Sequence, residues 1–147
     1  MQVLAFALAF LAGALVAIQI GSNTRLKEAA GEPLPALIIS SSIGVVALAV
    51  ALLVSREPWP PLAKLGAAPL SAWLGGLLGA GYAVVTVVLA RHLGAATLVA
   101  LVVTGQLVCS VLLDHFAVIG FEARPATFGR MAGGALLLGG VFLIWKF

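Results

Sequence analysis

The sequence predicts an all-α membrane protein with five transmembrane helices in a single domain, residues 1–147. Hydrophobic residues make up 63% of the 147 residues and charged residues only 9%, and the mean hydropathy is +1.20. A soluble domain is about one quarter charged, because its surface must meet water. The apolar residues also form long unbroken runs, whereas a transmembrane β-barrel alternates polar and apolar residues over segments of about ten. The solvent of this chain is therefore lipid.

Two spans are expected in the first third of the chain. A helix needs about 20 mostly apolar residues to cross the hydrocarbon core, and residues 2–21 form the first such stretch. This stretch has no basic residue ahead of it and exceeds the core of a signal peptide, so we expect it to be retained. Pro33 and Pro35 break any helix that continues out of the membrane, and the second span is expected at residues 36–54.

Three more apolar stretches follow, separated by polar or proline-rich segments. The longest loop, residues 55–69, contains four of the seven prolines. A tight turn at residues 91–94 and a loop at residues 121–126 separate the later spans, and Trp145 and Lys146 anchor the far end at an interface. The third, fourth and fifth spans are expected at residues 70–90, 95–116 and 127–146.

Small residues recur four positions apart inside these spans, a spacing that lets membrane helices approach closely. Such rows also arise by chance in helices rich in Gly and Ala, so they predict tight packing without identifying the neighbour. The rows are Ala72 with Gly76 and Ala80, Gly75 with Gly79 and Ala83, and Gly129 with Gly133.

The Lys and Arg residues do not select an orientation. With five spans, one face carries the N-terminus and the second and fourth loops, and the other carries the first and third loops and the C-terminus. Orientation normally follows an excess of Lys and Arg on the cytoplasmic side. Here each face has four: Arg56, Lys64, Arg124 and Arg130 against Arg25, Lys27, Arg91 and Lys146.

This balance favours dual topology, in which the chain inserts both ways and pairs as an antiparallel homodimer. The alternatives are that one loop dominates, or that an inverted five-span partner fixes the orientation. Many secondary transporters consist of two repeats of inverted topology with the substrate site between them, near the midplane. A five-span chain has the size of one such repeat.

Three stretches carry a family resemblance that covers nearly the whole chain. They are AIQIGSNTRLKEAAGEPLPALIIS (residues 17–40), PWPPLAKLGAAPLSAWLGGLLGAGYAVV (residues 58–85), and residues 91–143, which contain GQLVCSVLLDHFAVIGFEARPATFGR. They resemble the short five-span YdcZ-like family of the drug/metabolite transporter superfamily. The resemblance implies a half-size transporter like one repeat of the ten-span members, placed in the bacterial inner (plasma) membrane. The resemblance does not identify the solute.

Polar residues line one face of the fourth span. Gln106, Ser110 and Asp114 are each four positions apart, so they share a face of the helix. An unpaired amide in hydrocarbon costs several kcal/mol, so Gln106 is expected to face other helices or a wet cavity. It either joins two helices or offers hydrogen bonds in a translocation path, and its depth near the midplane favours the path.

Asp114 and His115 lie at the end of the same span, where the cost of charge falls. One interpretation is a hydrated helix end, with Asp114 paired to Arg91, Arg124 or Arg130, of which Arg124 is the nearer candidate. The other is a gate or a proton-linked carboxylate, with a histidine able to titrate near neutral pH. Both residues are retained as candidates for the path.

Three further candidates lie on other spans. Gln19 and Asn23 share one face at the end of the first span, where they form either an entrance to the path or simply a polar helix end. Tyr82 lies deep in the third span and needs a partner for its hydroxyl, so it is a candidate for contact with solute. The serines at residues 40–42 are expected to bond back to their own helix.

The sequence contains no motif for catalysis. A phosphate-binding GxxxxGK[ST] loop, a GxSxG elbow and an HExxH pair are all absent. His92 and His115 fall on opposite membrane faces, Cys109 is the single cysteine, and the basic residues are scattered rather than clustered. We therefore expect no enzyme activity, metal, cofactor or nucleic-acid partner.

The predicted function is a secondary transporter that moves a small neutral or weakly charged organic solute by alternating access. Its partners are that solute, the membrane lipids and a second, inverted copy or an inverted five-span partner. Two alternatives remain: a dual-topology channel, which would not show counterflow, and an accessory membrane subunit without transport.

Overall fold

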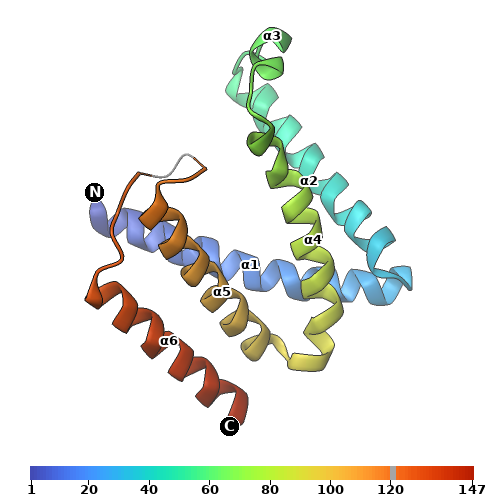
Figure 1. The fold of residues 1–147 in the computed structure, drawn as a ribbon. Helices are drawn as coiled ribbons and strands as arrows, with labels where there is room; N and C mark the ends of the chain where they lie inside the picture. The colour runs from blue at the N-terminus through green and yellow to red at the C-terminus, as the bar shows by residue number, and fades with distance from the viewer. Residues whose placement is uncertain (120–121) are drawn as a thin grey trace. The chain divides into compact units, whose positions relative to one another are not determined.

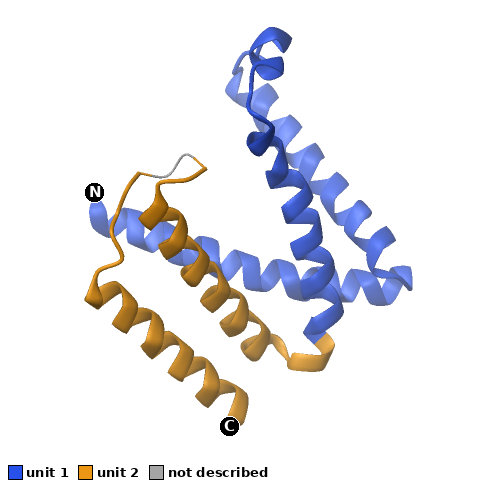
Figure 2. Cartoon of the chain, viewed as in Figure 1, with its two compact units in different colours: residues 1–90 blue, residues 91–147 orange. Residues whose placement is uncertain are grey.

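The computed structural model describes residues 1–119 and 122–147, and within these ranges the regular elements are all helices. Five of the helices are long and apolar enough to cross a membrane, which confirms the predicted fold class. The chain divides into two compact units, Met1–Ala90 and Arg91–Phe147 (Figure 2). The helices, labelled in Figure 1, are α1 (Gln2–Ala30), α2 (Pro33–Ser55), α3 (Leu62–Gly66), α4 (Leu70–Leu93), α5 (Ala95–Phe116) and α6 (Phe128–Lys146).

Helix α1 continues past residue 21, where the first apolar stretch ends, as far as Ala30. Its 29 residues give a length of roughly 44 Å, whereas the hydrocarbon core is about 30 Å thick. The added segment contains good helix formers such as Leu26 and Lys27 and no proline, so nothing stops the helix at the membrane surface. It ends at Gly31, whose φ of +82° needs a residue without a side chain.

Helix α2 begins at Pro33, ahead of the expected residue 36. Proline is tolerated in the first turn of a helix because the N–H groups there have no intrahelical partner. The close connection folds the start of α2 back onto the end of α1, and the two helices pack there. Their buried residues lie at this junction: Ile20 and Asn23 on α1, Ala36 and Leu37 on α2.

Helix α4 presents its glycines to open space. It extends through Arg91 to Leu93, and Gly94, with a φ of +75°, turns the chain towards α5. A Cβ atom added at Gly75, Gly76 or Gly79 would meet no atom within 4 Å. Within the described part of the chain, these small-residue rows therefore do not bring another helix close.

Unit 2 is an antiparallel pair of packed helices, α5 and α6 (Figure 1). Thr127 caps α6, and its side-chain oxygen accepts a hydrogen bond from the backbone N–H of Arg130 at 3.4 Å. The helix therefore begins at Phe128, one residue after the cap. This arrangement places the first turn of α6 beside the last turn of α5.

Large apolar side chains remain exposed on all five long helices, including Phe10, Leu53, Leu77, Leu112 and Leu136. Exposed apolar area on this scale marks contact with membrane or with another protein. In a bilayer it is solvated by lipid tails, so burial against the chain's own helices is not required. Polar side chains placed among these helices therefore need a specific explanation.

Candidate functional site

A cavity of about 920 Å³ lies within unit 1. Its volume is at the upper end of the range for small-molecule sites, roughly 300–1,000 Å³. Residues of α1, α2 and α4 line it, and no lining side chain in the described part of the chain carries a formal charge. Its polar lining residues are Gln19, Asn23, Ser40, Ser41, Ser42, Tyr82 and Thr86.

Asn23 is the buried polar residue on the α1 side of the cavity. Only 8% of its surface is exposed, and its Oδ1 accepts a hydrogen bond of 2.7 Å from the hydroxyl of Ser40 on α2. This bond joins the two helices where they pack. Ser42 behaves differently, because its hydroxyl donates to the carbonyl of Ile38 in its own helix at 2.8 Å. The three adjacent serines were all expected to bond back, and for Ser40 this expectation is wrong.

Tyr82 is the polar residue from α4 that most needs a partner. Its hydroxyl is buried and forms no hydrogen bond with any residue that the structure describes. One turn further along the helix, the Thr86 hydroxyl lies 3.0 Å from the carbonyl oxygens of both Tyr82 and Ala83. Tyr82 therefore lines the cavity, while its hydroxyl is buried beside it without a hydrogen-bonding partner among the described residues.

The structure thus brings three of the sequence-predicted residues, Gln19, Asn23 and Tyr82, to one cavity. Ser40 and Thr86 line it as well, and sequence reasoning did not single them out as site residues. Thr86 could have been found from its position four residues after Tyr82 on the same helix face. Ser40 could not, because three adjacent serines look alike until their helix is packed against another.

The other predicted residues, Gln106, Ser110, Asp114 and His115, lie on α5 in unit 2 and do not line this cavity. Gln106 is exposed on unit 2, and its backbone carbonyl accepts a 2.7 Å hydrogen bond from the Ser110 hydroxyl. Their role in a translocation path stays a prediction.

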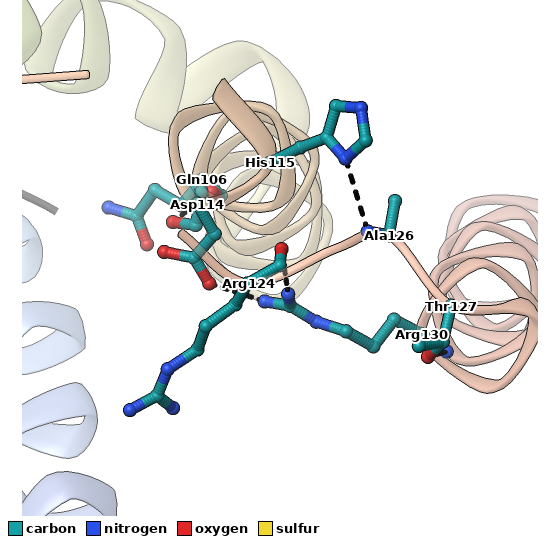
Figure 3. A network of polar contacts seen from close by, with 8 residues as sticks. Gln106, Asp114, His115, Arg124, Ala126, Thr127 and Arg130 are labelled. Carbon is teal, nitrogen blue, oxygen red and sulfur yellow. Dashed lines mark hydrogen bonds and ion pairs between the residues drawn. The ribbon is translucent and has the colours of Figure 1, made fainter. Parts of the chain in front are cut away.

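A polar cluster joins the end of α5 to the start of α6; it consists of Asp114, His115, Arg124, Ala126 and Arg130 (Figure 3). The Asp114 carboxylate forms an ion pair with the Arg130 guanidinium. The same guanidinium donates to the backbone carbonyl of Arg124 at 3.1 Å. The Arg124 N–H in turn donates to the Asp114 carbonyl at 2.8 Å.

The partner of Asp114 is therefore Arg130, and not Arg124, the candidate nearer in sequence. Arg124 contributes its backbone to the cluster, while its side chain points away from the carboxylate in Figure 3. Antiparallel packing explains the difference, because it brings the third residue of α6 back to the last turn of α5. Sequence proximity does not account for this return of the chain.

His115 connects the end of α5 with the segment that precedes α6. Its Nδ1 accepts a hydrogen bond of 3.3 Å from the backbone N–H of Ala126, and its ring stacks edge-on against Phe116. An imidazole nitrogen accepts a hydrogen bond through its lone pair, so Nδ1 is the acceptor nitrogen of this ring.

No group of three potential metal ligands is found among the described residues, and Cys109 is an exposed free thiol. The chemistry available in the two polar regions is hydrogen bonding in unit 1 and charge pairing in unit 2. Among the described residues, neither region contains an activated nucleophile beside a base. The mixed polar and apolar lining of the unit 1 cavity is of the kind found in small-molecule sites.

Comparison with known proteins relates the chain to a family of membrane exporters. A family model described as "Putative inner membrane exporter, YdcZ" matches residues 4–143. The inner membrane protein YdcZ of Escherichia coli strain K12 is 29% identical over 145 residues, which cover 97% of this chain and 95% of that protein. No solved structure matches the chain.

Proposed function

This chain belongs to the YdcZ family of the drug/metabolite transporters, and we propose that it exports a small organic solute as a half-size carrier that works by alternating access. Family membership makes it an inner membrane protein of an exporter family rather than an enzyme.

The observation that carries the proposal is the cavity in unit 1. It lies between three helices that are long and apolar enough to span the membrane, and its wall combines amides and hydroxyls with apolar side chains. A few placed polar groups in a mostly apolar pocket are typical of small-molecule sites. In lipid, a polar wall is stable only where it faces water, solute or other protein.

We propose further that the working unit is an antiparallel homodimer. Three features support this pairing. The five candidate spans are odd in number, so a single copy does not contain a complete inverted pair. The two membrane faces have four Lys or Arg each. Gly75 on α4 is open and does not line the cavity, and small residues let membrane helices approach closely.

The proposed pairing has a direct test, which is the location of the C-terminus. Reporters active only inside or only outside the cytoplasm are fused after Phe147 of the full chain. Signal from both reporters is the expected result. Signal from only one would contradict dual insertion, and the inverted partner would then have to be a different five-span protein.

Transport itself is tested by counterflow. The purified chain is reconstituted into liposomes that are loaded with a bacterial small-molecule extract and then diluted into the same extract carrying a uniform ¹³C label. A carrier accumulates the labelled form of its solute in exchange for the unlabelled form. A channel equilibrates solutes without such exchange, and an accessory subunit behaves like empty liposomes.

A further inference from the structure

The polar groups of the unit 1 cavity differ in whether their hydrogens are already donated in hydrogen bonds within the protein. Ser40 donates its hydroxyl hydrogen to Asn23 Oδ1. Ser42 donates to the carbonyl of Ile38, and Thr86 donates to carbonyls of its own helix. A hydroxyl has one hydrogen to donate. These three side chains are therefore already engaged, and they offer a solute only lone pairs.

Two donors that are shielded from solvent remain in the cavity. The Gln19 amide and the Ser41 hydroxyl also line it without a hydrogen bond among the described residues, but both residues are exposed. The Tyr82 hydroxyl is buried without a partner among the described residues. Asn23 uses its Oδ1 to accept from Ser40, which leaves the two hydrogens of its Nδ2 amino group. Both side chains line the same cavity. A buried donor that stays unpaired destabilises the protein, so a ligand that supplies an acceptor gains binding energy here.

The rest of the wall excludes ions and accepts apolar surface. None of the described lining residues is charged, so an ionic solute would lose its hydration without gaining a counter-charge. On the α4 side the wall contains Gly76, Gly79 and Ala80, and it leaves room beside the helix because a Cβ added at either glycine meets nothing within 4 Å. An apolar ring or chain fits against such a surface.

We infer that the cavity binds an uncharged amphipathic solute whose hydrogen-bond acceptor, of the amide or other carbonyl class, is received by the Asn23 amino group and by the Tyr82 hydroxyl, which turns from its buried position to meet it. The apolar part of the solute lies against the glycine-rich side of α4. This inference rests on the proposed function only in treating the bound molecule as cargo; the binding itself does not depend on it.

Four probes on one benzene skeleton test the inference: phenylacetamide, phenylacetate, phenethylammonium and propylbenzene. The first is uncharged with a carbonyl acceptor, the next two are an anion and a cation, and the last has no acceptor. Each is added to the full chain in nanodiscs of phosphatidylethanolamine and phosphatidylglycerol, with empty nanodiscs as the blank for partitioning into lipid.

The chain offers a specific reporter, because Tyr82 is its single tyrosine. With ¹³C at the ζ carbon of tyrosine, the protein gives one phenol resonance, whose shift reports hydrogen bonding by the hydroxyl. Phenylacetamide is expected to shift this resonance saturably. The two ions and propylbenzene are expected to leave it unchanged at the same concentration. An equal response to phenylacetate, or none to phenylacetamide, overturns the inference.

Equilibrium dialysis with radiolabelled phenylacetamide supplies a second readout. Tyr82→Phe keeps the ring and removes the donor, and it is expected to weaken binding roughly fivefold. Asn23→Leu is expected to have an effect of similar size. Ser55→Ala is the matched control, because it removes a hydroxyl that bonds to its own helix at Leu52 and does not line the cavity.

Wild-type affinity in both cavity variants would also overturn the inference. The result of these binding experiments can be distinguished from the result of the counterflow experiment, which tests the proposed function. Selective binding of phenylacetamide without any counterflow contradicts export but leaves the two donors assigned. Counterflow of an ionic solute by a protein that does not bind phenylacetamide supports export and contradicts the assignment of the two donors.

Discussion

The carboxylate of Asp114 at the end of α5 forms an ion pair with the guanidinium of Arg130 in the first turn of α6. Each charge lies at the unfavourable end of its own helix. The C-terminal end of a helix is partially negative and disfavours Asp114, and the N-terminal end is partially positive and disfavours Arg130. The ion pair thus compensates two unfavourable placements at once.

This arrangement predicts a strongly non-additive pair of substitutions. Asp114→Asn or Arg130→Gln alone leaves one uncompensated charge and should lower the free energy of unfolding by about 1 kcal/mol. The double variant removes both charges and should be nearly as stable as the parent. A double-mutant cycle in detergent micelles measures the coupling. Additive effects would show that the pair contributes nothing.

The contact between His115 and Ala126 predicts protection of one backbone amide. His115→Leu removes the acceptor and should speed hydrogen exchange at Ala126 by about threefold, since the bond is exposed and its net contribution is below about 1 kcal/mol. His115→Asn retains an acceptor oxygen close to the position of Nδ1 and should preserve the protection. Exchange measured by NMR on the chain in nanodiscs separates the two variants.

The bond between Ser40 and Asn23 predicts a measurable link between α1 and α2. Ser40→Ala leaves the buried Oδ1 of Asn23 without its donor and should cost about 1 kcal/mol of stability, as is typical of hydrogen bonds between membrane helices. Ser42→Ala removes a hydroxyl that bonds within its own helix and should cost less than half as much. Equal losses, measured by unfolding in mixed micelles, would contradict the role of Ser40.

The number and type of helices followed from composition, because five apolar stretches separated by polar or proline-containing segments leave few other folds in lipid. The position at which α1 ends did not follow from the composition. A hydropathy pattern marks where the membrane stops, whereas the helix stops where the backbone must turn, at Gly31. Helix α1 ends before Pro33, as the prolines predict, but Pro33 also starts α2, because proline is tolerated in the first turn of a helix.

The candidate site was predictable only one helix at a time. The four-residue spacing of Gln19 and Asn23 and the depth of Tyr82 can be read along single helices. Which hydroxyl meets Asn23, and which arginine meets Asp114, depends on how two helices pack, and nothing in the local sequence encodes that. The pairing of Ser40 with Asn23 therefore emerged only from the structure, which also selected Arg130 from the three arginines that the sequence offers as partners of Asp114.

The equal charge of the two membrane faces predicts that added cations fix the orientation of the chain. Ala63→Lys with Ala67→Lys adds two positive charges in the second loop, both at exposed positions. By the positive-inside rule this face becomes cytoplasmic, and a reporter after Phe147 should then be active only outside. Ala29→Lys with Phe147→Lys adds two positive charges to the opposite face, and the reporter should then be active only inside.

If the working unit is antiparallel, each of these two variants alone lacks an inverted partner. Copies carrying different tags should then co-purify weakly, by about tenfold less than the parent, when either variant is expressed alone. Co-expression of the two variants supplies both orientations and should restore co-purification. Glutamine at the same four positions changes the side chains without adding charge, and it should leave the parent behaviour intact. Strong self-association of a variant held in one orientation would exclude the antiparallel dimer, because such copies can pair only in parallel.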